Sequence, residues 1–240
     1  MPLIDLKNTT VVFEDGYSEA GAVNLMAGYT AGASSIVVDG IVGIIPEGSR
    51  INFVGDVTDY TVVSTVESSG NTTTIVISPV LVEDLTDNQV FNVYGVFLEI
   101  KVGEGTITWS ENSPREFKLD RGLLDQVRDA DQVPMDVSFQ LMYEALTASN
   151  PSTDPPTPMD VIYRRGAAAS WVSTNPDTCA PFCFNIRMDH SPPNCGSAFP
   201  TERTVLPMFY TEKKDYDPKQ GMISISGKCN AVKANVTRLV

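Results

Sequence analysis

The chain has 240 residues, of which 42% are hydrophobic and 20% charged, so it can bury a core and is not expected to be disordered. Thirty acidic and seventeen basic residues give a formal net charge of −13, which argues against a general nucleic-acid binder because phosphate contacts need clustered Lys and Arg. The single histidine, His190, argues against most chemistry that needs an imidazole base or several His ligands. We therefore expect a protein that is not an enzyme, with no membrane-spanning helix and no signal peptide.

The acidity is uneven along the chain. Residues 22–97 carry eight acids and one base, whereas residues 149–240 carry eight acids and ten bases. Two interpretations stay open. The charge keeps the protein soluble, or an acidic face of one copy of the chain meets a basic face of another, because complementary electrostatic fields set register and partner choice.

Short strands with turn residues between them are predicted in the first part of the chain. Residues 9–13 (TTVVF) form the first, before the turn at Glu14-Asp15-Gly16. The next six are expected at 34–38, 41–45, 50–54, 59–66, 72–77 and 89–94. Five or six such strands, punctuated by Gly, Pro and Asp, predict a small antiparallel β-barrel or sandwich, and we assign residues 22–97 to this module.

The rest of the chain, with residues 1–21, is predicted to form a second domain over residues 98–240. Residues 97–103 and 133–146 alternate between apolar and polar side chains, which is typical of half-buried strands. Further strands are expected at 105–110, 115–119, 182–188, 203–210, 221–226 and 232–238. A Pro/Ser/Asp-rich linker precedes a helix predicted at 158–165, with Thr157 as its cap and Asp160 in its first turn.

The cysteines form the one pattern that resembles a metal site. Cys179 and Cys183 have a spacing found in zinc sites, but Cys195 and Cys229 form no matching second pair, and His190 is a possible substitute ligand. Three states stay open: free buried thiols, a structural zinc site, and disulfides formed after assembly. No other cofactor is expected.

Carboxylates and aromatic side chains give no clear site. Asp125, Asp129 and Asp131 alternate with Arg121 and Arg128, which favours an ion-paired or solvated surface over catalysis. An acid-dependent hydrolase would need two carboxylates in one cleft. The two Trp and eight Tyr residues are scattered, which favours core or interface roles over a carbohydrate platform.

Residues 98–146 combine two alternating strands, a Pro-Arg-Glu-Phe entry at 114–117, the segment LDRGLLDQVR at 119–128 and VPMDVSF at 133–139. This block resembles the major tail tube proteins of long-tailed bacteriophages. The segment GMISISGKCN at 221–230 is similar to the closing strand of that family, and PPNC at 192–195 fits its carboxyl-terminal half.

This resemblance implies a tail-tube β-sandwich or barrel with one flanking α-helix, here interrupted by the inserted β module. In the family, six copies form a ring whose sheets join into one inner β-barrel, and rings stack into a hollow tube through which double-stranded DNA passes into the host. The implied partners are further copies of the chain, the tape-measure protein and the tail terminator or tip proteins. The implied location is the virion, after synthesis in the host cytoplasm.

A long charged loop, here residues 113–132, reaches the next ring in that family. The implied self-assembly contacts are Arg115, Asp120, Arg121, Asp125, Arg128 and Asp129. An acidic chain also suits a conduit for DNA, because a basic lumen would bind phosphate.

Three other functions stay open from the residues alone. A carbohydrate-binding or host-adhesion module would group aromatic side chains on one exposed face. A zinc-stabilised β protein would depend on the cysteines. Another neck or tail component is the third, within the same structural class.

Overall fold

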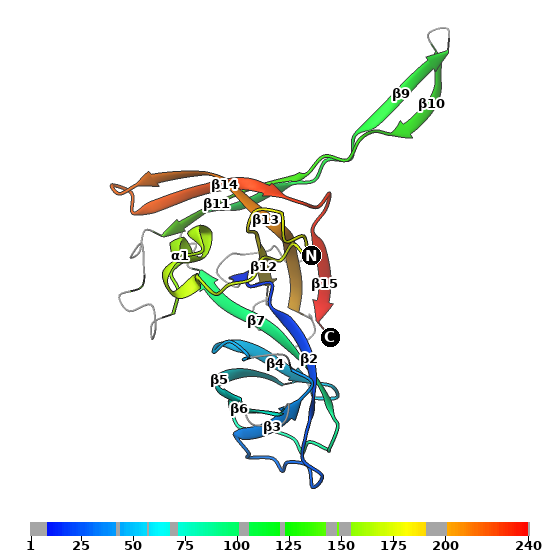
Figure 1. Ribbon diagram of the computed structural model, residues 1–240. Helices are drawn as coiled ribbons and strands as arrows, with labels where there is room; N and C mark the ends of the chain where they lie inside the picture. The colour runs from blue at the N-terminus through cyan, green and yellow to red at the C-terminus, as the bar shows by residue number, and fades with distance from the viewer. Residues whose placement is uncertain are drawn as a thin grey trace, which may run out of the picture. The chain divides into compact units, whose positions relative to one another are not determined.

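The computed structural model describes residues 9–41, 44–56, 58–67, 72–100, 106–120, 123–142, 148, 155–190 and 201–239. Strands dominate this part of the chain, with one α-helix and one 3-10 turn (Figure 1). The expectation of a mainly β protein with one α-helix is confirmed. The chain divides into two compact units, which we call the barrel unit (Glu14–Phe97 with Trp171–Ser173) and the sheet unit (the remaining residues).

The barrel unit is a closed six-stranded antiparallel β-barrel. Its strands pair in the order β2-β3-β6-β5-β4-β7, and β7 pairs again with β2, so no edge is left open. Their bounds are β2 Ser18–Val23, β3 Ser35–Asp39, β4 Ser49–Phe53, β5 Asp59–Glu67, β6 Thr72–Ser78 and β7 Val90–Ile100. The succession of short apolar, β-branched runs and turns explains this architecture.

The barrel interior is filled by apolar side chains that alternate with outward-facing ones. On β6, Thr73, Ile75 and Ile77 are buried, and on β4 Ile51 and Phe53 are buried. The whole core cluster is Val23, Ile36, Val38, Ile45, Ile51, Phe53, Tyr60, Val62, Ile75, Ile77, Leu81, Leu85, Phe91 and Val93. This unit therefore has a hydrophobic core of its own.

Two expectations for the barrel unit differ from the structure. No strand includes the described residues of 41–45. Ile45 still lies in the core, but Pro46 follows it and begins a turn in which its carbonyl accepts the N–H of Ser49. The expected start at residue 22 falls inside β2, whose residues Ser18–Ala22 pair with β7, so the unit begins earlier, at Glu14.

The sheet unit is built on a sheet in the order β1-β12-β13-β14-β11-β8, with β15 on β13, and its strands from β12 to β8 pair antiparallel. The bounds are β1 Thr9–Glu14, β8 Ile107–Ser110, β11 Met135–Met142, β12 Phe184–His190, β13 Thr201–Asp217, β14 Met222–Cys229 and β15 Asn235–Leu239. The long strand β13 serves two sheet segments, because β12 pairs with its first half and β14 with its second.

The core of the sheet unit is an aromatic cluster. Phe13 from β1 lies 4.6 Å from Phe184 and 5.8 Å from Phe139, measured between ring centroids. Phe209 from β13 lies 5.5 Å from both Phe139 and Phe184. All four side chains are at most 2% exposed, so edge-to-face and tilted ring contacts hold the strands of this unit together.

The helix α1 (Pro158–Tyr163) begins as predicted. The Thr157 hydroxyl accepts the N–H of Asp160, and the Asp160 carboxylate accepts the N–H of Thr157, which is a complete capping box. The helix ends two residues earlier than predicted, because Arg164 takes the left-handed conformation that caps helices, with φ 46°.

Candidate functional site

One face of the sheet unit is polar and faces solvent. It belongs to four consecutive strands, the second half of β13, β14, β11 and β8, and strict alternation on β11 leaves Asp136, Ser138, Gln140 and Met142 outward. Register places Ser224 and Ser226 of β14 opposite Gln140 and Ser138. Thr108 and Ser110 of β8 follow on the other side of β11. We call this surface the polar face. It presents serine, threonine and glutamine side chains together with charged ones, and Met142 at one end.

The lysines of the polar face are paired with acids. Lys228 Nζ lies 3.0 Å from Asp136 Oδ1, and this carboxylate raises the pKa of Lys228. Lys213 Nζ lies 2.6 Å from Asp215 Oδ2. Two more acids belong to the same strand: Glu212, which raises the pKa of Lys228 further, and Asp217 at the end of the strand. Each base thus has an acid beside it, so this face offers little positive charge to a polyanion.

Both borders of the four-strand segment are open among the described strands. β8 ends the strand order. On β13, residues 202–209 pair with β12, and no described strand covers residues 210–217 on the side away from β14. Such edges carry unpaired backbone groups and can pair with another chain.

The segment expected to be a charged loop is a β-hairpin. β9 (Arg115–Asp120) pairs with β10 (Leu123–Asp129), and this two-stranded sheet pairs with no other described strand. Figure 1 shows the hairpin extending away from the sheet of its own unit. The loop expectation for 113–132 was wrong in this respect, because Val127 and Phe117 pair across the strands and continue the alternation through the charged residues.

The hairpin has an apolar side that is not covered. Phe117, Leu119 and Val127 are 61%, 65% and 52% exposed. Phe117 and Leu119 alternate on one strand, and Val127 lies opposite Phe117, so the three share one face. Three exposed apolar side chains on one face of a two-stranded hairpin are typical of a surface that another protein covers.

The predicted contact residues fall around this face. Arg115 and Asp129 form an ion pair at the base of the hairpin. Arg128 lies opposite Glu116, on the other face from Phe117. The side chains of Asp120, Arg121 and Asp125 lie outside the described residues. The sequence analysis predicted the charged residues as contacts and missed Phe117 and Leu119. Their spacing of two residues within the expected strand 115–119 is the signal that could have identified them.

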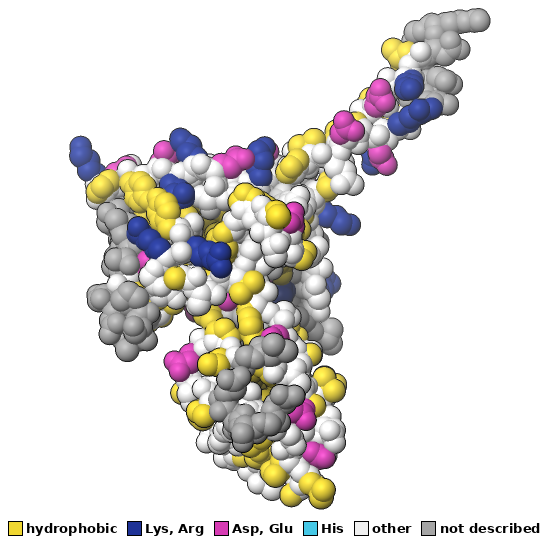
Figure 2. Space-filling model, viewed as in Figure 1, with side chains coloured by type: hydrophobic (Ala, Val, Ile, Leu, Met, Phe, Trp, Pro, Cys, Tyr) yellow, Lys and Arg dark blue, Asp and Glu magenta, His cyan; other side chains and the backbone are white. Residues whose placement is uncertain are grey.

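A basic and aromatic cluster lies beside the open edge of β13. The hydroxyls of Tyr163 and Tyr216 are 3.0 Å apart, and Lys214 Nζ lies 4.5 Å from the centroid of the Tyr163 ring. The Arg165 guanidinium lies 4.9 Å from the same ring. Figure 2 shows Lys and Arg side chains beside hydrophobic ones over this part of the sheet unit, near α1. Tyr163 and Tyr216 are 45% and 42% exposed, so the cluster can still accept a partner.

The aromatic residues otherwise divide between core and surface. Trp171 and Tyr60 are buried, whereas Trp109 is 39% exposed on β8. Within the described residues, the exposed Tyr163–Tyr216 pair is the arrangement that comes nearest to a shared aromatic surface.

The cysteines with described positions form no metal centre. Cys183 and Cys229 are buried and form no disulfide bond, and burial raises the pKa of Cys229 to about 12. Cys179 is an exposed free thiol, and Cys195 lies outside the described residues. His190 Nδ1 lies 3.0 Å from the Thr9 hydroxyl. In the described part of the chain, no three His, Cys, Asp or Glu side chains gather as metal ligands would.

A buried carboxyl lies at the start of the barrel unit. Asp15 Oδ1 accepts the N–H of Val172 at 2.6 Å and that of Tyr17 at 3.3 Å. Burial raises the pKa of Asp15 to about 6, and these backbone hydrogen bonds limit the rise. The contact joins Trp171–Ser173 to the rest of the barrel unit through a carboxyl group that changes protonation near pH 6.

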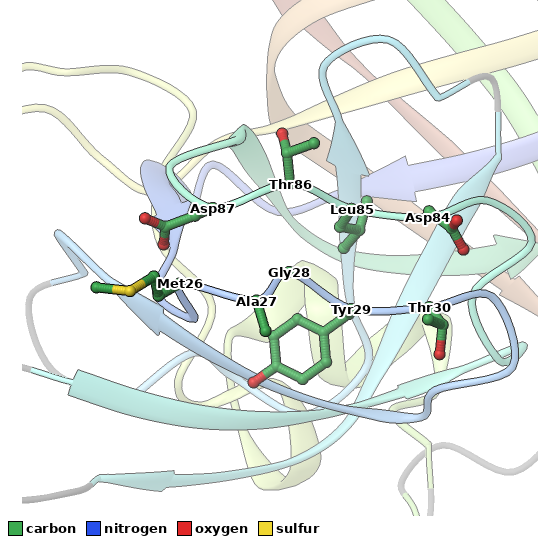
Figure 3. Close-up of a pocket in the computed structure, with 9 residues that line it drawn as sticks. All are labelled: Met26, Ala27, Gly28, Tyr29, Thr30, Asp84, Leu85, Thr86 and Asp87. Atoms are coloured by element: carbon green, nitrogen blue, oxygen red, sulfur yellow. The ribbon is translucent and has the colours of Figure 1, made fainter.

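The barrel unit also has a shallow pocket of about 280 Å³ (Figure 3). Two chain segments line it, residues 26–30 and 84–87, which run side by side through the bridge between Tyr29 and Leu85. Asp84 accepts the N–H of Ala31, and Asp87 accepts that of Leu25. Both carboxylates accept backbone hydrogen bonds, so their position at this pocket is explained by their role in holding the two segments in place.

No helix in the described part of the chain is long and apolar enough to cross a membrane. Comparison with models of protein families, with curated protein sequences and with solved structures finds no match. Within the described residues, the polar face, its two open edges and the hairpin are the features that bear on function.

Proposed function

We propose that this chain is a structural protein that assembles into stacked hexameric rings, which form the hollow tail tube of a long-tailed bacteriophage. The observation that carries the proposal is the four-strand segment of the sheet unit, which has one polar face and two open edges. The resemblance of residues 98–146 and 221–230 to major tail tube proteins supports the same assignment, and both of these regions contribute to that segment.

The strand directions suit a continuous barrel. β13 and β11 run one way, and β14 and β8 run the other. Since the number of strands is even, β8 of one copy can pair with β13 of the next in the antiparallel sense that the sheet already uses. A head-to-tail contact of this kind repeats around a ring and closes it.

The expected size of such a barrel suits a DNA conduit. Six copies of four strands give about 24 strands, and a spacing of about 4.8 Å gives a circumference of about 115 Å and a diameter of about 37 Å before tilt. Tilt widens the barrel further, and barrels of about 16–18 strands already hold an aqueous channel. A double helix fits inside, with side chains of the polar face between it and the backbone.

The electrostatics of the polar face favour passage over binding. Tight DNA binding requires basic side chains that neutralise phosphates. On the polar face, Lys228 and Lys213 are each held beside an aspartate, and the other positions are serines, a threonine and a glutamine, with Met142 and Met222 at one end. Such a lumen offers the DNA duplex few binding sites for its phosphates.

The hairpin provides a contact between rings in this proposal. Its exposed apolar side, with Phe117, Leu119 and Val127, would be covered by a copy in the adjacent ring. The tape-measure protein inside the growing tube, and terminator or tip proteins at its ends, are the further partners that the proposal entails.

Electron microscopy of the purified chain over a range of concentration and salt tests this function. We expect hollow tubes or six-fold rings. The variants Ser138→Lys and Ser224→Lys place positive charge on the polar face. The control Thr61→Lys places the same charge on an exposed position of the barrel unit. Tubes of the first two variants should still hold DNA at a salt concentration that releases DNA from tubes of the control. Equal DNA retention by both sets would contradict a lumen-facing polar face.

A further inference from the structure

The two open edges of the four-strand segment carry side chains that complement each other. β8 presents Trp109, 39% exposed, on the face opposite to the polar face, because Trp109 pairs with the buried Val137. β13 presents Lys214 and Tyr216 on that same face, because they pair with the buried Ile225 and Ile223. One edge thus offers an indole, and the other a tyrosine pair beside an ammonium group.

Strand register within one copy fixes how far apart these groups lie along the strands. Trp109 lies level with Val137, Gly227 and Thr211. Tyr216 lies level with Ile223 and Leu141, four residues further along β11. Two flat sheets placed edge to edge would therefore bring Trp109 beside Thr211 and not beside Tyr216.

A closed barrel is not flat, and its tilt supplies the missing offset. In an eight-stranded barrel, a tilt of about 36° goes with a stagger of about one residue per strand. At a similar tilt, a copy of four strands is staggered by about four residues against the next copy. A stagger of this size in one direction brings Trp109 opposite Tyr216 of the neighbouring copy.

The free part of the β13 edge selects that direction. The opposite stagger would bring Trp109 to the part of β13 that ends at Phe209, which β12 already covers. The permitted direction also brings Glu111, two residues beyond Trp109 and just past the end of β8, level with Lys214 of the neighbouring copy. The same register therefore places Trp109 beside Tyr216, an aromatic contact, and Glu111 beside Lys214, a contact between opposite charges.

We infer that the lateral seam between copies is closed by Trp109 and Glu111 of one copy against Tyr216 and Lys214 of the next. Tyr163 from α1 backs this contact, because its hydroxyl lies 3.0 Å from that of Tyr216 and its ring lies under Lys214. The partner is a second copy of this chain. The inference rests on the proposed function and adds the residues and the register of its ring contact.

Cysteine cross-linking tests the register. A chain with Trp109→Cys and Tyr216→Cys, and with Cys179 and Cys195 changed to Ser, should form interchain disulfides on oxidation, giving a ladder up to six copies on a non-reducing gel. A disulfide within one chain is excluded. Because β11 and β14 lie between β8 and β13, three strand spacings of about 4.8 Å place β8 and β13 about 14 Å apart. A disulfide needs Cα atoms within about 7 Å of each other.

The matched control is Trp109→Cys with Thr211→Cys, which would cross-link only if the seam had no stagger. If rings or tubes form and the control pair gives the ladder while the Tyr216 pair does not, the seam register is refuted and the proposed function stands. If the unmodified chain forms neither rings nor tubes, both fail together.

Charge reversal gives an independent measurement. Glu111→Lys or Lys214→Glu alone should raise the critical concentration for assembly at least tenfold, and the two together should restore it to within about threefold. Because the Glu111 carboxylate also accepts the N–H of Ala234, the melting temperature of each variant is measured as a check on folding. A double variant no better than the singles would contradict the Glu111–Lys214 contact.

Discussion

Replacing Phe117 by Ser should block tube growth without unfolding the subunit. The Phe117 side chain is 61% exposed on the hairpin, so the isolated chain gains little from it. With about 200 Å² for a Phe side chain, docking covers about 120 Å², which corresponds to about 3 kcal/mol at about 25 cal/mol per Å². Because association also costs side-chain ordering, we expect a 10- to 100-fold rise in critical concentration, about 1.4 to 2.8 kcal/mol.

Sedimentation of assembled tubes over a dilution series measures this concentration, and thermal unfolding measures the subunit. The matched control is Lys118→Ser, on the same strand but on the opposite face of the hairpin, which should change the critical concentration less than threefold. Equal effects of the two substitutions, or unchanged assembly of the Phe117→Ser variant, would refute the account of the hairpin. A large fall in melting temperature would show instead that Phe117 stabilises the subunit.

Three further predictions concern charge, pH and packing. Asp120→Lys with Asp125→Lys should prevent tube growth while the subunit stays folded by circular dichroism, and normal tubes from this variant would contradict the assembly role of the hairpin end. Asp15 has a pKa of about 6 in the fold, against an ordinary value of 3.8, so the folded state binds more protons than the unfolded state between these pH values. The free energy of unfolding should therefore rise as the pH falls from 7 to 4, by up to about 3 kcal/mol relative to the Asp15→Asn variant. If the free energies of unfolding of the two proteins changed equally with pH, this prediction would be wrong. Gly227→Ala would place a methyl group 2.0 Å from the Tyr210 carbonyl oxygen and 2.9 Å from the Phe209 ring, so the sheet unit should lose about 2–3 kcal/mol in urea denaturation, whereas Ser226→Ala should not.

Local sequence signals predicted the elements that follow simple rules. Alternation predicted β11, and its burial pattern is strict along all eight residues. The Thr157–Asp160 capping box and Pro158 predicted where α1 begins. These elements were predictable because the same residues that carry the signal also make the stabilising contacts.

Long-range contacts determined the elements that sequence missed. β2 has the weak sequence SEAGAV, yet it closes the barrel, and Gly21 is small because a Cβ there would lie 2.6 Å from the Asp39 carbonyl oxygen and 2.7 Å from the Phe91 ring. β10 is rich in charge and was not predicted as a strand, because its stability comes from pairing with β9. No local pattern reports such cross-strand contacts.

The candidate site was predictable only in part. The resemblance selected residues 113–132, and the structure places an exposed apolar surface there, built by Phe117, Leu119 and Val127. The complementarity of Trp109 and Tyr216 could not be predicted, because it depends on which strands form the open edges and on the register across β14 and β11.

In the proposed tube, the four-strand segment of the sheet unit lines the lumen. A cryo-electron microscopy reconstruction of the assembled protein would reveal this lining. We expect six copies per ring, one continuous antiparallel barrel, Ser138 and Ser224 facing the lumen, and Trp109 of each copy against Tyr216 of its neighbour. A tube whose polar face points outward, or an assembly in which β8 and the second half of β13 stay unpaired, would contradict it.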